Sequence, residues 1–451
     1  MRMFYTEYHP QKRYDMAISE SFAMTELGAL PEEWDVVNLG EVGKVVTGKT
    51  PSTKEKRFWN GTIPFITPAE LQGSAICNTE RTITEDGLKV SKALPRGTVL
   101  VSCIGYIGKV GIVDRHIAVT NQQINAIIPD KHAANNWYLA YMFIYLEPRL
   151  KEAASITTVP ILNKSNFELT KIPLPPLPEQ HRIAAILSAV QDAKEKTGAV
   201  IAAAKSLKKS LMRHLFTYGP VPAGAAESVP LTETEIGLVP EGWEVVRLGE
   251  LYDKKLIKIQ NGFPSGNWNE KGIGIPHIRP FNVSEEGKIV FGNLKYIQID
   301  KNIEKYILQN GDVIFNNTNS EGLVGKTAYW DNGDEFVLSN HMTIIRVLNY
   351  GVVDPIFLAA YLHKKWFDGL YLGLCRRHVN QASISLARLK SIPIPLPPLP
   401  TQQKIASILS TVDQKIEAEE NKKKALDELF KSLLHNLMTG KIRVNHLEAI
   451  S

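Results

Sequence analysis

Cysteine is scarce in this chain of 451 residues, which holds three cysteines: Cys77, Cys103 and Cys375. They lie far apart in the sequence, and no two of them have the C-x-x-C spacing that zinc sites and redox motifs use. An odd number of isolated thiols does not suit a disulfide framework, whereas it fits a reducing compartment. We therefore expect no disulfide framework, no zinc site and a cytoplasmic location.

Long apolar runs are also missing. The most apolar stretch, WYLAYMFIYL from Trp137 to Leu146, is roughly half of the ~20 residues that a membrane-spanning helix requires. The N-terminal sequence MRMFYTEYHPQKRYDM lacks the apolar core of a secretory signal. Both absences predict a protein that does not associate with a membrane.

The chain has no strong excess of charge of one sign. It contains 52 Lys and Arg against 47 Asp and Glu, and its formal net charge is +5. This mild positive charge permits a nucleic-acid partner but does not by itself argue for one. A length of 451 residues exceeds what one ordinary hydrophobic core supports, so we expect two or more domains.

Catalytic signatures are the fourth absence. The sequence contains no glycine-rich S-adenosylmethionine loop with an acidic partner, no Asn-Pro-Pro-Tyr-type motif, no metal-binding histidine spacing and no serine nucleophile elbow. The stretch SEGLVGKT, Ser320 to Thr327, resembles a phosphate-binding loop but has serine in place of its first glycine. We interpret this stretch as a turn, and we expect no cofactor, no metal site and no catalytic residue.

What the sequence does contain is a long internal repeat. IPLPPLPEQHRIAAIL at 172–187 returns as IPLPPLPTQQKIASIL at 394–409, 222 positions later. GALPEEWDVVNLGE at 28–41 returns as GLVPEGWEVVRLGE at 237–250, and shorter matching pairs follow in the same order. The offset drifts from 209 to 222, as small loop insertions would produce. The chain is therefore interpreted as two copies of one plan.

Each copy begins with a globular segment of mixed α/β class. Short β-rich runs bounded by Gly, Asn or Asp, such as TVLVSCI and NAIIP in the first copy and DVIF and TIIRVL in the second, predict strands. Helices are expected around 137–147 and 355–366. The stretch YGPVPAGAAESVP at 218–230, rich in Pro, Ala and Gly, predicts a linker between the copies.

Each copy ends with a proline run that leads into a long helix. Proline fixes φ and has no N–H to donate, so PLPPLP predicts a rigid polyproline-type spacer that ends where the helix begins. In the first helix, apolar or small residues recur every seven positions from Ile183 to Leu211, and a second column runs three places later from Ile186 to Leu207. The second helix has apolar residues at both ends and a polar middle, EAEENKKK.

Neither helix carries its own partner nearby, so we expect the two to pair antiparallel as a coiled coil. On this interpretation the lysines of the first helix lie on its solvated face. These lysines are Lys194, Lys205, Lys208 and Lys209.

The order W…V-x-LGE, IPFI, GTVLVS and IPLPPLPEQHRIAAIL, followed by the whole series again, resembles the specificity subunits of type I restriction–modification enzymes. The resemblance covers about Leu27 to Arg443, and the doubled IPLPPLP-x-Q-x-x-I is its most specific part. It implies two target recognition domains that each read half of a split double-stranded DNA site, and two conserved helices that space them with pseudo-two-fold symmetry. It also implies two adenine-N6 methyltransferase subunits and two ATP-dependent endonuclease subunits as partners, with no catalysis by this chain.

The predicted parts of the chain follow from the repeat and the resemblance. They are an N-terminal extension at 1–26 without a counterpart in the repeat, a first recognition domain at 27–171, a first proline–helix spacer at 172–217, a linker at 218–235, a second recognition domain at 236–391, a second proline–helix spacer at 392–443 and a C-terminal tail at 444–451.

The two copies differ most in their polar loops, where readers of two different half-sites are expected. Asn and Gln can pair with adenine, and Lys and Arg can contact phosphate, whereas the alternative for each is a side chain that bonds only to water. The candidate DNA-binding residues in the first copy are Lys49, Thr50, Ser52, Lys54, Arg57, Tyr106, Lys109, Asn121, Gln122 and Gln123. Those in the second copy are Asn261, Ser265, Asn267, Trp268, Asn316, Asn317, Thr318, Asn319, Lys326, Asn340, His341, Arg376 and Arg377.

Two other functions account for parts of the sequence. A self-contained methyltransferase or nuclease would bind its own methyl donor or cut DNA alone. A coiled-coil adaptor would bind only proteins, through the helices or through the proline runs as ligands of SH3- or WW-type domains. Crosslinking of a methyl donor to the isolated chain would favour the first alternative, and a lack of duplex-DNA affinity beside a methyltransferase partner would favour the second.

Overall fold

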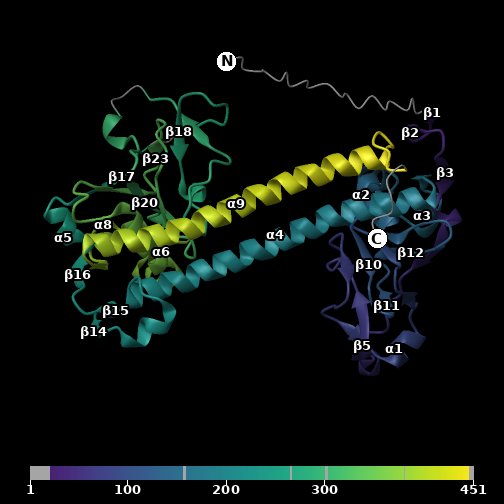
Figure 1. Cartoon of the computed structure of the whole chain (residues 1–451), viewed down its shortest axis with the longest axis horizontal. Helices are drawn as coiled ribbons and strands as arrows, with labels where there is room; N and C mark the ends of the chain where they lie inside the picture. The colour runs from purple at the N-terminus through teal and green to yellow at the C-terminus, as the bar shows by residue number, and fades with distance from the viewer. Residues whose placement is uncertain (1–20, 156–158, 265–266, 300–302, 380, 446–451) are drawn as a thin grey trace, which may run out of the picture. The chain divides into compact units, whose positions relative to one another are not determined.

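The computed structural model describes residues 21–155, 159–264, 267–299, 303–379 and 381–445. The chain forms two compact units (Figure 1). Unit 1 comprises residues 1–196 and 423–451, and unit 2 comprises residues 197–422. Each unit therefore contains one globular segment of the repeat together with parts of both long helices, α4 (Leu177–Tyr218) and α9 (Leu399–Met438). The predicted mixed α/β class is confirmed.

Unit 1 contains two main sheets. One has the strand order β4 (Gly43–Thr47), β12 (Ile124–Pro129), β9 (Val99–Ser102), β10 (Val110–Val113) and β6 (Ala75–Ile76). The other has the order β7 (Thr82–Ile83), β5 (Trp59–Ile66), β11 (Ile117–Thr120) and β8 (Leu94–Pro95). The helical elements are η1 (Leu39–Glu41), η2 (Lys56–Phe58), α1 (Glu85–Lys89), α2 (Asn136–Glu152) and α3 (Lys164–Glu168).

Strand β9 shows why this sheet has little exposed surface. Successive side chains of a strand point to opposite faces. Val99 and Val101 pack in the cluster that contains the apolar residues of α2, whereas Leu100 packs in a second cluster with Ile66 and Leu94 of the other sheet. A strand that is buried on both faces has no polar alternation, which explains the continuous apolar run VLV.

Unit 2 repeats this architecture with shorter strands. Its main sheet has the order β17 (Ile257–Asn261), β24 (Thr343–Val347), β20 (Asp312–Phe315) and β22 (Thr327–Tyr329), and a second sheet has the order β19 (Lys295–Ile297), β18 (Ile275–Ile278) and β23 (Val337–Leu338). A third has the order β21 (Thr318–Asn319), β26 (Ala382–Ser383) and β25 (Arg376–Arg377). The helical elements are η3 (Ala223–Ser228), α5 (Leu248–Asp253), η4 (Pro280–Asn282), η5 (Glu304–Tyr306), α6 (Pro355–Phe367), α7 (Leu370–Leu374) and α8 (Leu386–Lys390).

A small hairpin opens each copy and corrects one predicted boundary. In unit 1, β1 (Phe22–Thr25) pairs antiparallel with β2 (Gly28–Pro31), and in unit 2, β14 (Leu231–Thr234) pairs with β15 (Gly237–Pro240) in the same register. Residues 22–26 therefore do have a counterpart in the repeat, contrary to the expectation for residues 1–26. Likewise the stretch predicted as a linker up to residue 235 includes a strand. The two outer strands share few residue types, so sequence matching missed them.

The proline runs were predicted to be rigid polyproline-type spacers, but part of each run forms a β-strand instead. In unit 1, β13 (Lys171–Leu174) pairs antiparallel with β3 (Asp35–Asn38), and in unit 2, β27 (Pro393–Leu396) pairs with β16 (Glu244–Arg247). A two-stranded ribbon tolerates proline because each strand has one edge without ladder hydrogen bonds. The helices begin within the proline runs, at Leu177 and Leu399, where a proline in the first turn loses no intrahelical hydrogen bond.

The glutamine of the doubled motif holds each helix to its own globular segment. In unit 1, Gln180 Oε1 accepts from the Asn135 backbone N–H at 2.9 Å, and Nε2 donates to the carbonyls of Pro175 at 2.9 Å and Ala133 at 3.1 Å. In unit 2, Gln402 makes the same three contacts, to Asp354 N–H at 2.9 Å and to the carbonyls of Pro397 at 2.8 Å and Val352 at 2.9 Å. Both side chains are buried. The repeated sequence thus encodes a repeated joint between helix and domain.

The buried column of α4 differs from the predicted one. Val200 and Leu207, placed in the predicted second column, are 42% and 53% exposed. The column that faces the partner helix lies four rather than three positions after the first one. It consists of Leu187, Lys194, Ile201, Lys208 and Leu215, all of them buried or half-buried. Two lysines interrupt its apolar pattern, so the sequence favoured the wrong column.

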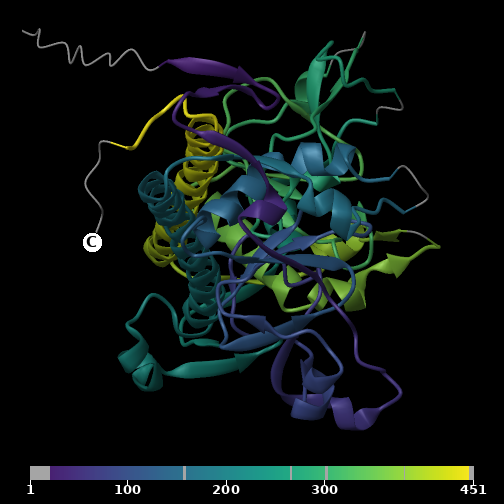
Figure 2. The same cartoon turned by 90° about the vertical axis from the view of Figure 1, so that its right-hand side faces the viewer.

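The same lysines show that the two helices pair antiparallel in each unit (Figures 1 and 2). In unit 1, Lys194 Nζ lies 2.8 Å from a carboxylate oxygen of Asp427. In unit 2, Lys208 and Lys205 lie 2.7 Å and 2.9 Å from the carboxylates of Asp413 and Glu420, so a higher number on α4 meets a lower number on α9. The predicted antiparallel pairing is confirmed. The expectation of a solvated face was wrong for Lys194, Lys205 and Lys208, whose side chains are 12–34% exposed, whereas Lys209 is exposed as expected.

The chain returns to the start of unit 1 after α9. The guanidinium of the buried Arg443 bonds Glu179 at 2.8 Å and Glu33 at 2.8 Å, and Trp34 Nε1 donates to Glu179 at 3.1 Å. Val444, the first residue of the predicted tail, is also buried, so the packed structure continues past residue 443. In the part of the chain that the structure describes, no helix has both the length and the apolar character to cross a membrane.

Candidate nucleic-acid interface

Three polar loops of unit 1 meet at one end of its five-stranded sheet. Strands β4 and β9 end there at Thr47 and Ser102, and β12 begins there at Ile124, because all three are antiparallel neighbours. The loops are 48–55, 103–109 and 121–123. We call this end of the sheet loop edge 1.

Two close contacts shape loop edge 1. A Cβ on Gly48 would lie 2.0 Å from the carbonyl oxygen of Asn121, so only glycine allows the first loop to cross over the third. The Lys49 N–H then donates to the Thr120 carbonyl at 2.9 Å. Thr50 Oγ1 donates to Gln122 Oε1 at 2.7 Å, which orients an exposed amide at the edge.

Most candidate residues of the first copy gather at loop edge 1. Lys49 and Ser52 are exposed on the first loop. Asn121 Nδ2 donates to Gln123 Oε1 at 2.9 Å, so these two amides bond to each other. Lys54 is exposed further along the first loop. Arg57 lies beyond it in η2, where its carbonyl accepts from Thr84 Oγ1, and it is not brought to the edge.

Tyr106 is the most prominent aromatic group at loop edge 1, with 67% of its surface exposed. The ammonium groups of Lys109 and Lys151 lie 5.1 Å and 5.9 Å from the centre of its ring. Lys151 also bonds Glu147 at 2.7 Å, and this hydrogen bond raises the pKa of the lysine. Sequence reasoning did not select Lys151, because it is the second-last residue of α2 and lies far from the polar loops in sequence.

Unit 2 brings the equivalent loops together at what we call loop edge 2, formed by residues 261–264, 316–326 and 339–342. Thr343 Oγ1 lies 3.2 Å from both Asn261 Oδ1 and Asn317 Oδ1, which ties the ends of β17 and β20 to the start of β24. A Cβ on Gly262 would lie 2.2 Å from the carbonyl oxygen of Ser339. The close crossing at Gly48 is therefore repeated. Asn340 is exposed and His341 is half-buried on the third loop.

A short hairpin adds a further wall to loop edge 2. Strand β26 pairs with β21 and with β25, so Ser383 lies opposite both Thr318 and Arg376. This pairing brings Arg376, Arg377 and the segment Thr318–Asn319 together, although about 57 residues separate them in sequence. Both arginines are exposed, and Arg377 lies 2.5 Å from the Glu321 carboxylate.

The counterpart of this hairpin in unit 1 was missed. Ile161 pairs with Ile104 of the second loop, and the Gly105 N–H donates to the Pro160 carbonyl at 2.9 Å. The segment after α2 therefore borders loop edge 1 as the segment after α7 borders loop edge 2. It carries no charged residue, so a search for polar or basic clusters could not find it. Its position after the same helix in the repeat was the available signal.

Two candidates of the second copy are buried. Lys326 is 5% exposed, and its ammonium group donates to the Val283 carbonyl inside the unit. Burial lowers the pKa of Lys326. Asn316 is fully buried as well. These positions do not support the predicted contact of the two side chains with DNA, because both are buried at the base of an otherwise exposed turn.

The remaining candidates lie on the long loop after β17. Ser265 lies outside the described residues. Asn267 and Trp268 are exposed, and the Trp268 ring lies 4.3 Å from Lys295 Nζ and 5.4 Å from the Arg279 guanidinium. The neighbouring Asn269 is bridged to Tyr296, so this part of the loop lies over the smaller sheet rather than over loop edge 2.

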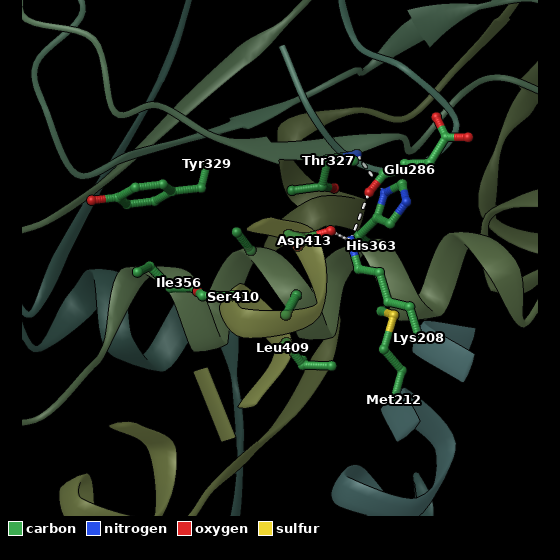
Figure 3. A pocket seen from close by; sticks show the side chains of 13 residues that line it. Lys208, Met212, Glu286, Thr327, Tyr329, Ile356, His363, Leu409, Ser410 and Asp413 are labelled. Atoms are coloured by element: carbon green, nitrogen blue, oxygen red, sulfur yellow. Dashed lines mark hydrogen bonds and ion pairs between the residues drawn. The ribbon is translucent and has the colours of Figure 1, made fainter. Parts of the chain in front are cut away.

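The residues that the structure describes contain no group of three or more His, Cys, Asp or Glu side chains that could hold a metal ion. A cavity of about 60 Å³ in unit 2 is lined by Lys208, Asp413, Thr327 and His363 (Figure 3). This volume holds a few water molecules and no cofactor. Burial lowers the pKa of His363 to about 3, so its ring is neutral and serves as a hydrogen-bonding core residue.

Comparison with known proteins places these features in a family. The family model of the type I restriction modification DNA specificity domain matches the chain twice, at residues 31–202 and 240–428. The type I restriction enzyme MjaVIII specificity subunit of Methanocaldococcus jannaschii is 30% identical over 93% of this chain and 95% of its own length. The MjaIX specificity subunit of the same organism is 27% identical over 94% of this chain and 97% of its own length.

A solved structure supports the fold. The crystal structure of a type I restriction–modification S subunit from M. genitalium superposes with a TM-score of 0.57, covers 90% of this chain and 96% of that one, and is 16% identical. The two family matches span most of the sequence and coincide with the two copies of the repeat. The chain therefore belongs to the family of type I restriction–modification DNA specificity subunits.

Proposed function

We propose that loop edges 1 and 2 each read one half of a bipartite, asymmetric DNA site. The observation that carries the proposal is that both edges are built from the same strand ends and the same glycine crossing, yet expose different polar side chains. A shared scaffold with different tips suits two readers that bind duplexes in the same way and recognise different bases. Membership of the family does not by itself assign roles to individual loops.

At loop edge 1 we assign base reading to Gln122. Its Oε1 accepts from Thr50 and retains a second lone pair, and its side chain is exposed. An amide held in this way can bond the N6 and N7 edge of adenine in the major groove. At loop edge 2 we assign the equivalent role to Asn340, which is exposed on the matching loop.

Phosphate contact is assigned to different walls of the two edges. At loop edge 1 the exposed cations Lys49 and Lys54 lie on the first loop, whereas at loop edge 2 the exposed Arg376 lies on the hairpin after α7. Phosphate contacts position a protein on the duplex without reading its sequence. Each half of the proposed interface thus combines one reading loop with one basic wall.

We further propose that this chain performs no catalysis and binds two adenine-N6 methyltransferase subunits and two ATP-dependent endonuclease subunits in the cytoplasm. Membership of the specificity-subunit family supports this assignment. Native mass spectrometry of the chain co-expressed with the methyltransferase subunit is expected to show a complex of two methyltransferase subunits with one copy of this chain. A stable 1:1 complex without larger species would contradict it.

The reading roles are tested by sequencing the methylated sites of a host that expresses the complex with Gln122→Ala or Asn340→Ala. We expect each variant to relax one position in one half-site, at a cost of about 1–3 kcal/mol in discrimination, and to leave the other half-site unchanged. The matched control is Gln191→Ala, a half-buried glutamine on α4 outside both loop edges. A variant that weakens methylation of all sites equally would show that its residue does not read bases.

A further inference from the structure

The ion pairs between α4 and α9 do not follow the internal symmetry of the chain. In unit 1, Lys194 of α4 bonds Asp427 of α9, and its Nζ also lies 4.6 Å from the centre of the Phe430 ring. In unit 2, Lys208 of α4 bonds Asp413 of α9, and Figure 3 shows the two side chains turned toward each other. The lysine side chains are only 18% and 12% exposed. Both cations come from α4, and both anions come from α9.

The two helices correspond residue by residue at an offset of 222 positions, which allows the symmetric partners to be identified. The α9 residues equivalent to Lys194 and Lys208 are Ile416 and Phe430, which are both buried. The α4 residues equivalent to Asp427 and Asp413 are Lys205 and Gln191. The charge pattern of each helix is thus complementary to the other helix and not to itself.

Pairing of identical helices in the same register would therefore be unfavourable. Two copies of α4 would place Lys194 opposite Lys205 twice, and like charges at facing positions repel. Two copies of α9 would place Asp427 against Ile416 and Asp413 against Phe430. The two carboxylates, which are 42% and 27% exposed in the observed pairs, would then lose their ammonium partners and face apolar side chains. The hydrogen bond from Lys194 lowers the pKa of Asp427, which keeps this carboxyl ionised in the observed pair.

We propose that these two ion pairs select the pairing of α4 with α9 and exclude pairing of either helix with the same helix of a second copy of this chain. Polar groups within a helix interface can specify which helices associate, at some cost in stability. Identical helices would carry identical loop edges, whereas α4 with α9 joins two different ones. That last consequence rests on the proposed function, but the selection of the helix partner does not.

The decisive variant replaces both pairs by apolar residues: Lys194→Met, Asp427→Leu, Lys208→Met and Asp413→Leu in the full-length chain. Apolar replacement of an ion pair in a packed interface is often neutral or stabilising, so the melting temperature should be maintained. Selection should be lost, and light scattering after size exclusion should show dimers and larger species that increase with concentration. A variant that stays monomeric wherever the parent chain is monomeric would overturn the proposal.

A charge exchange provides a second, independent readout. Lys194→Asp and Asp427→Lys should each lower the melting temperature, and the double variant should recover most of the loss because the pair is restored with its charges reversed. The matched control is Lys196→Asp, an exposed lysine on the same helix outside the buried column, which should change little. A double variant as unstable as the single ones would overturn the proposal. Because no DNA enters either experiment, failure of the proposed DNA reading cannot be confused with failure of this selection.

Discussion

Lys49 and Lys326 illustrate how position, rather than residue type, decides what a lysine can do at a loop edge. Lys49 follows the glycine crossing, and its side chain is exposed, whereas Lys326 turns inward and bonds a backbone carbonyl. A cation contributes to DNA affinity by releasing counterions from phosphates. Only an ammonium group that reaches the solvent can do so.

Lys49→Gln is expected to weaken binding of cognate and unrelated duplexes by the same factor, and to reduce the slope of log K against log salt by about one unit. Lys326→Gln is expected to leave this slope unchanged and to lower stability instead. Fluorescence anisotropy of the assembled methyltransferase complex at several salt concentrations measures both. A reduced slope in Lys326→Gln would show that its ammonium group reaches DNA after all.

His277 makes stability sensitive to acid. It is buried in β18, and this burial lowers its pKa to about 4, against an ordinary value of 6.5. Between these two pH values the unfolded chain binds a proton that the folded chain does not bind. The free energy of unfolding therefore falls as the pH drops from about 6.5 toward 4, by up to about 1.4 kcal/mol per pH unit from this residue.

His277→Phe should remove this part of the pH dependence, because Phe65 occupies the equivalent place in the repeated IPFI sequence of unit 1 and is fully buried there. Urea unfolding at pH 7 and at pH 5, followed by hydrogen exchange in β18, compares the variant with the parent chain. His132→Phe, on an exposed residue of unit 1, is the control. An unchanged pH dependence would show that His277 is not the group responsible.

At the scale of an element, the first turn of each long helix depends on one glutamine. Gln180→Leu removes the partners of one buried carbonyl, one half-buried carbonyl and one half-buried N–H in unit 1, and a buried group left unsatisfied costs about 1–3 kcal/mol. We expect faster hydrogen exchange at the start of α4 and in the loop before α2. Gln402→Leu should produce the same change at the start of α9 in unit 2.

The two variants control each other, because each should affect its own unit. Gln191→Leu provides a further comparison, since its side chain bonds only the exposed Glu195 among the contacts described for it. Hydrogen exchange read by mass spectrometry resolves the two units in the full-length chain. Equal protection in Gln180→Leu and the parent chain would show that the amide does not hold the joint.

At the scale of the whole molecule, the proposed function requires the helices to set the separation of the two half-sites. Sites read from one face of the duplex have centres about 34–36 Å or ~10 bp apart, so with half-sites of about 3–5 bp the unspecified spacer should be about 5–8 bp. This expectation follows from the doubled proline–helix motif and from the stiffness of a helix pair.

Insertion of seven residues into both helices, after Ile201 in α4 and after Asn421 in α9, should lengthen the pair by about 10 Å, equivalent to about 3 bp of DNA. Lys194–Asp427 and Lys208–Asp413 keep their partners in this design. Sequencing of the methylated sites should reveal a longer spacer between unchanged half-sites. An unchanged spacer would show that the helices do not measure the distance, and altered half-sites would show that the loop edges are not independent readers.

The sequence by itself determined the parts of this protein that depend on local pattern. The repeat, the strands β9, β12, β20 and β24, the helices α2 and α6, and the antiparallel pairing of the two long helices all follow from periodicity and from matching motifs. Loops at equivalent places in the two copies also predicted most of loop edge 1, because antiparallel strands bring their connecting loops to one end of a sheet.

Only the tertiary structure decided which faces are buried. Lys194 and Lys208 occupy the helix seam because Asp427 and Asp413 neutralise them there, and these partners lie more than 200 residues away in sequence. Lys326 turns inward to a carbonyl of a distant loop, and Arg376 reaches loop edge 2 because its hairpin partner β26 pairs with the distant strand β21. A polar side chain is expected to be exposed unless a group distant in sequence forms a hydrogen bond or an ion pair with it inside the protein. Which group does so depends on the complete fold.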